Sequence, residues 1–134
     1  MPLLTPSRPT RAGSLAALRR AQRHDAIISA RRAGRLPMVV LYTTSIAARP
    51  LLTGYARSQG WQVNEDEFFD HPGRGRGFAM ACAATESPTA DGILTLNRRM
   101  LPAGADNTYE RTLRLLGRHR AFLEFVPPML AGLA

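Results

Sequence analysis

Short apolar segments alternate with longer amphipathic ones along this chain. A continuous apolar run with β-branched residues lies at 38–42, a pattern typical of a strand buried on both faces, and residues 91–96 predict a second buried strand that follows Asp91. Two further strands are predicted over residues 61–70 and 122–126. The amphipathic segments between the four strands predict helices over residues 50–59, 78–84 and 108–119.

This order predicts an α/β fold, a three-layer α/β/α arrangement around a mostly parallel four-stranded sheet. Neither residues 39–41 nor residues 93–96 alternate polar with apolar positions. We therefore expect these two strands to be central, adjacent and parallel. The length of 134 residues suits one such domain with a single core.

A separate helix is predicted over residues 14–33, with Ser14 as its N-cap and Gly34 after its end. Its apolar stripe is thin, and arginines occupy much of the remaining surface. We predict a basic N-terminal arm at 1–35, joined to an α/β domain at 36–134. The pattern is compatible with this helix lying either on the domain or on a polyanion.

The charge of the chain is concentrated in that arm. All 18 basic residues are arginine, and ten acidic residues leave a net charge of +8. Residues 1–35 hold eight arginines against one acid, whereas residues 36–134 hold ten against nine. Such a block indicates a polyanionic partner such as DNA, and a solubilising tail is the alternative. The arginines of the arm expected to contact phosphates are Arg19, Arg20, Arg23, Arg31 and Arg32.

Other classes of protein are disfavoured by composition. The single cysteine, Cys82, excludes an internal disulfide framework, and three scattered histidines offer no zinc-ligand spacing. We expect no metal and no cofactor, and we interpret Cys82 as a small core residue. No apolar stretch reaches the roughly 18 residues that a membrane span needs, and no secretory signal is evident. A cytoplasmic protein without membrane contact is predicted.

Three polar segments follow predicted strands or precede a helix. Ser45 ends the first strand segment, and Arg98 and Arg99 follow the third. A glycine-rich loop carries Arg74 and Arg76. The carboxyl ends of parallel strands lie together at one end of the sheet, where ligands bind. A hydroxyl among guanidinium groups suits attack on a phosphate, because negative charge accumulates on the phosphoryl oxygens. The plainer alternative is a turn serine beside solvated arginines.

Taken in order, residues 37–127 resemble the catalytic domain of serine recombinases of the resolvase/invertase type. The resemblance rests on the strand and turn at 39–45, on the aromatic-alanine helix ending in Gly-Trp at 55–61, and on residues 91–101. It implies that Ser45 attacks a DNA phosphodiester to form a phosphoserine link. It also implies that Arg98 stabilises the transition state, with Arg74, Arg76 and Arg99 binding phosphate and no metal taking part.

The sequence departs from that family at its chemistry. Thr43 stands where the family has an active-site arginine, Asn97 replaces an aspartate, and Leu101 replaces a second arginine. We expect no counterpart of the family's long helix after the catalytic domain, or of its DNA-binding C-terminal region. We therefore expect a degenerate resolvase-like domain that binds DNA or a recombinase partner, or forms a homo-oligomer. The alternatives are an active serine recombinase and an unrelated small α/β protein.

Overall fold

Helices and strands alternate along the whole of the computed structural model, which describes residues 11–69, 76–86, 90–102 and 107–131. In chain order the elements are α1 (Arg11–Arg32), β1 (Met38–Thr43), the 3₁₀ turn η1 (Ile46–Ala48), α2 (Arg49–Ser58), β2 (Gln62–Phe69), α3 (Arg76–Glu86), β3 (Gly92–Thr95), the 3₁₀ turn η2 (Arg98–Met100), α4 (Asn107–Arg118), β4 (Phe122–Phe125) and α5 (Pro128–Ala131). The predicted strands and helices are thus confirmed, and the apolar C-terminal segment adds the short α5.

The four strands form one parallel sheet in the order β2-β1-β3-β4. The central pair is β1 and β3, with Val40 opposite Ile93 and Leu41 opposite Leu94. These four side chains are at most 2% exposed. The prediction that the two apolar runs are adjacent, parallel and central is confirmed.

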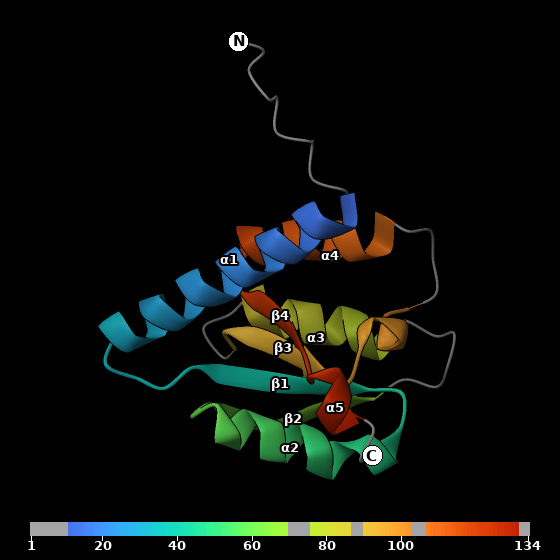
Figure 1. Cartoon of the computed structure of the whole chain (residues 1–134). Coiled ribbons are helices and arrows are strands. Elements are labelled where there is room, and N and C mark those ends of the chain that lie inside the picture. Colours follow the sequence, from blue (N-terminus) through green and yellow to red (C-terminus); the bar gives the residue numbers. More distant parts are fainter. Residues whose placement is uncertain (1–10, 70–75, 87–89, 103–106, 132–134) are drawn as a thin grey trace.

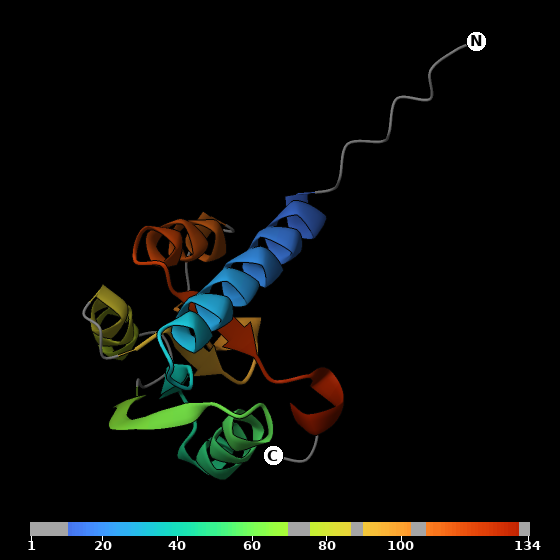
Figure 2. The ribbon, with the colours of Figure 1, turned by 90° about the vertical axis from the view of Figure 1, so that its left-hand side faces the viewer.

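Helices cover both faces of this sheet, which gives the predicted three layers (Figures 1 and 2). On one face α3 and α4 pack Phe78 and Leu113 against Tyr42. On the other face α2 packs Leu52 into a cluster with Leu94. The strand sequences therefore lack an alternating polar face because neither face of the sheet meets water.

The N-terminal helix α1 lies along the β4 edge of the sheet, beside α4 (Figures 1 and 2). Leu15, Ala26 and Ala30 are its buried apolar residues. Of the two positions left open by the sequence, α1 takes the one on the domain. The helix begins at Arg11, so the prediction of Ser14 as N-cap is wrong. Arginine and alanine at positions 11 and 12 are good helix formers and extend the first turn beyond that serine.

Candidate functional site

The carboxyl ends of β1 and β3 lie at the point where the order of the sheet reverses. From β1 the chain passes through α2 to β2 at one edge, and from β3 it passes through α4 to β4 at the other. The two connections leave in opposite directions, and ligands of such sheets bind beyond the strand ends at this kind of reversal. Ser45 follows β1 and Arg98 follows β3, so these two predicted residues flank that reversal.

At the end of β1, Thr43 holds the backbone of Ser45. The Ser45 amide donates to Thr43 Oγ1 at 2.9 Å, and that hydroxyl donates to the Ser45 carbonyl at 2.8 Å. Thr43 itself is 7% exposed. The Ser45 side chain is half-buried and makes no capping hydrogen bond to η1. The position that the resemblance assigns to an active-site arginine is therefore a buried hydroxyl committed to the turn.

At the end of β3, the short turn η2 presents two exposed arginines. Asn97 Oδ1 accepts a hydrogen bond from the Arg99 amide at 2.9 Å and so caps η2. The guanidinium carbon of Arg98 lies 4.7 Å from the ring centroid of Tyr109, in the first turn of α4. A cation over an aromatic face at this distance is attracted to it. Arg98 is thereby held at the junction of η2 and α4.

One side-chain contact joins the two strand ends. Thr44 Oγ1 lies 2.8 Å from Met100 Sδ, which links the segment after β1 to η2. Among the described residues, no hydrogen bond connects the Ser45 hydroxyl with Arg98 directly. The structure thus places both predicted residues beyond the carboxyl ends of the two central strands, with the Arg98 guanidinium packed on Tyr109.

The remaining predicted loop residues are only partly described. Arg76 is the first residue of α3 and is exposed, and Arg99 is exposed on η2. Arg74 lies outside the described residues. None of the described contacts brings Arg76 to the strand ends.

Two of the predicted arm arginines are ion-paired within the fold. Arg19 Nη1 lies 2.6 Å from Glu124 Oε1, and Arg23 Nε lies 3.2 Å from Glu124 Oε2. Glu124, on β4, is 3% exposed. The Tyr55 hydroxyl donates to the same carboxylate at 3.3 Å. We call these four residues the Glu124 cluster, and it attaches α1 to the sheet.

Aromatic rings lie next to both arginines of the Glu124 cluster. The Arg19 guanidinium lies 5.1 Å from the centroid of Phe125, and that of Arg23 lies 5.6 Å from Trp61. Burial, and then the nearby Glu124 charge, raise the pKa of Tyr55 above its ordinary value. A neutral phenol is therefore kept as a donor to the carboxylate.

A further arginine of the arm also has a structural partner, whereas three others have no ion pair among the described residues. Arg35 forms a two-point contact with Asp91, with Nη2 2.8 Å from Oδ1 and Nη1 2.5 Å from Oδ2. The exposed arginines of α1 that remain from the prediction are Arg20, Arg31 and Arg32. The part of the arm charge open to a partner is therefore smaller than the sequence count.

The sequence reasoning missed a second group of arginines. Arg111, Arg114, Arg118 and Arg120 lie on α4 and just after it, and all are exposed. The net charge summed over residues 36–134 is only +1, and this sum conceals the arginine-rich segment. A count over the predicted helix alone gives an excess of arginine and would have found it.

Cys82 lies in a cavity of about 610 Å³ between α3 and α4. Thr85 Oγ1 donates to the Cys82 carbonyl at 2.7 Å and lies 2.9 Å from His119 Nδ1. Because the hydroxyl has a single proton, His119 Nδ1 must be the donor in the second contact. The imidazole is thus oriented by Thr85, and Cys82 packs in the core, as predicted.

Cys82 should be an unreactive thiol in the folded protein. Burial raises its pKa from 9.0 to about 11. The unfolded thiol ionises first, so the free energy of unfolding should fall as the pH rises from about 9 to about 11. Urea unfolding of the wild type and of Cys82→Ala at several pH values measures this component. An identical pH dependence in the two proteins would contradict the assignment.

Neither a cluster of metal-ligating side chains nor a membrane-spanning helix is found among the described residues. Within residues 11–69, 76–86, 90–102 and 107–131, no group of three or more histidine, cysteine or acidic side chains is placed to hold a metal ion. In the same part of the chain, no helix combines the length and apolar character that a bilayer span requires.

Comparison with known proteins supports the architecture. No family model matches the sequence, and no curated protein matches it significantly. Among solved structures, the chain is similar to the N-terminal catalytic domain of TP901-1 integrase, with a TM-score of 0.56 and 20% sequence identity over 66% of this chain and 76% of that one. At this identity the likeness concerns the fold alone. The chain therefore has a resolvase-like α/β fold.

Proposed function

We propose that this chain is a resolvase-like domain that binds the DNA backbone at the ends of β1 and β3 and does not transfer strands. Arg98 and Arg99 supply two guanidinium groups beside Ser45, at the carboxyl ends of the strands, where such sheets bind ligands. Arginine suits this task because it is always charged and can bind a phosphate through two hydrogen bonds. We also propose the cytoplasm as its compartment.

The observation that carries the absence of strand transfer is the role of Thr43. Its side chain is a neutral hydroxyl, which is buried and hydrogen-bonded to the backbone of Ser45. This position therefore offers no positive charge to a five-coordinate phosphorus. Removing one preorganised transition-state donor costs about 10²–10³ in rate. Leu101 occupies a second position where the resembled family has arginine, and it is 8% exposed in the core. With both of these arginine positions replaced, phosphate binding is the activity that we propose for the strand ends.

The test is a search for a covalent intermediate. We expect no protein–DNA adduct on denaturing electrophoresis after incubation with a nicked duplex, and equal DNA binding by the wild type and Ser45→Ala. Arg98→Ala should weaken binding, whereas Arg57→Ala, an exposed arginine on α2, should not. An adduct formed by the wild type and absent from Ser45→Ala would overturn the proposal and identify a working recombinase domain.

A further inference from the structure

The outward side of α4 carries a stripe of arginines. Arg111, Arg114 and Arg118 are all exposed, and the Arg114 side chain is 71% accessible. At about 100° per residue, these three positions fall within about 60° of arc. Glu110 is the one acidic residue in this helix, and it pairs with Arg114 at 3.1 Å.

The opposite side of α4 is fully occupied by the core. Tyr109, Leu113 and Leu116 pack against the sheet and are at most 8% exposed. The apolar face is therefore closed to a membrane, and the arginine stripe is the face left for a partner. Arg111 and Arg118 have no ion pair among the described residues.

The arginines of the stripe also repel one another. Arg114 lies three residues after Arg111 and four before Arg118, and like charges at these spacings are unfavourable on a helix. The Glu110–Arg114 pair and the position of Arg118 in the last turn offset part of this repulsion. A phosphate backbone laid along the stripe would remove the rest.

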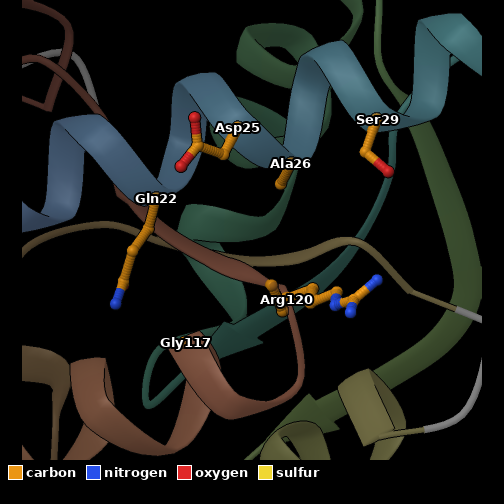
Figure 3. A pocket seen from close by; sticks show the side chains of 7 residues that line it. Gln22, Asp25, Ala26, Ser29, Gly117 and Arg120 are labelled. Atoms are coloured by element: carbon orange, nitrogen blue, oxygen red, sulfur yellow. The ribbon is translucent and has the colours of Figure 1, made fainter.

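A side chain of α1 reaches across to α4. A Cβ on Gly117 would lie 2.7 Å from Gln22 Nε2, so the amide group of Gln22 occupies the space beside this glycine. Gln22 Nε2 in turn donates to the Leu113 carbonyl at 2.9 Å. Figure 3 shows Gln22 reaching from α1 toward α4 and Arg120 on the facing segment.

A further arginine continues the charge beyond the C-terminal end of α4. Arg120 lines a cavity of about 270 Å³ with Asp25 and Ser29 of α1, and these two residues also line a neighbouring cavity with Arg32. Exposed arginines therefore extend along α4 toward the end of α1, with one acidic residue between them.

We propose that this α4 surface, formed by Arg111, Arg114, Arg118 and Arg120, binds the phosphates of duplex DNA. The choice of DNA rests on the proposed function; the surface itself is additional to the strand ends. From Arg111 to Arg118 the helix rises about 10 Å, a straight and fixed span that suits a stiff, regularly charged duplex.

The test removes charge from α4 while keeping its helix propensity. Arg111→Gln/Arg118→Gln should lower the slope of log affinity against log salt by about 1.8, at roughly 0.9 per lost phosphate contact, and weaken binding of a random 20-base-pair duplex by about tenfold at 0.1 M salt. Without DNA, its melting temperature should change little, because the repulsion that is removed offsets the loss of the Arg118 charge at the C-terminal end of α4. Arg118→Gln should give half the change in slope. Arg57→Gln is its matched control, because Arg57 is likewise exposed in the last turn of a helix.

The outcomes separate the two proposals. Unchanged binding by the double variant, with weaker binding by Arg98→Ala, would overturn the α4 surface and leave the proposed function standing. Weaker binding by the double variant, with Arg98→Ala unaffected, would support the α4 surface and overturn the strand-end site. An equal loss in Arg57→Gln and Arg118→Gln would reduce the effect to net charge and overturn the α4 surface. A wild-type chain that binds no duplex would overturn both.

Discussion

Replacing Arg19 and Arg23 together by methionine should lower the free energy of unfolding by about 3–5 kcal/mol. The Glu124 side chain is 4% exposed, and the two guanidinium groups are its charged partners on α1. Removing them leaves a buried carboxylate without a compensating charge, and breaking such a pair from one side has a cost of this size. Denaturant unfolding followed by circular dichroism measures the loss.

Two variants make this test specific. Adding Glu124→Met to the double variant should restore most of the stability, because apolar side chains of similar volume often replace a buried ionic group without loss. Arg20→Met, which changes the exposed neighbour of Arg19, should have little effect. If the triple variant is as unstable as the double variant, the stability comes from packing of the arginine side chains and not from the ion pairs.

Leu94→Asp should abolish folding. Leu94 lies in the central strand β3, is 0% exposed and pairs in register with Leu41 of β1. An unpaired carboxylate there costs several kcal/mol, which is comparable with the whole stability of about 5–15 kcal/mol of a small domain. We expect insoluble protein or the loss of the cooperative melting transition.

The matched control is Leu36→Asp, the same substitution at a residue that is 53% exposed. It should change the free energy of unfolding by no more than about 0.5 kcal/mol. A soluble Leu94→Asp protein with an unchanged melting transition would contradict the position of β3 in the sheet.

Much of the fold could be predicted from the sequence because burial on both faces leaves a direct pattern. The runs that became β1 and β3 contain mostly apolar residues, and helical connections between consecutive strands are typical of parallel pairing. The position of α1 could not be predicted in the same way. Its attachment depends on Arg19 and Arg23 contacting Glu124, and hydrophobic periodicity does not register a polar anchor of this kind.

The candidate site could also be predicted only in part. Ser45 and Arg98 could be placed at the same end of the sheet because each follows a parallel strand. The Tyr109 contact of Arg98 depends on where the first turn of α4 packs, which a strand-end argument does not contain. The role of Thr43 likewise became clear only from its two hydrogen bonds to Ser45.

The Glu124 cluster also constrains the order in which the protein can fold during synthesis. Arg19 and Glu124 are 105 residues apart in sequence, so their contact closes a loop that contains the whole sheet. At a synthesis rate of about 5–20 residues per second, Glu124 is made roughly 5 to 20 s after Arg19. During that interval α1 lacks its partner on β4. Contact between the first helix and the last strand is therefore a late step, which must wait for the synthesis of β4.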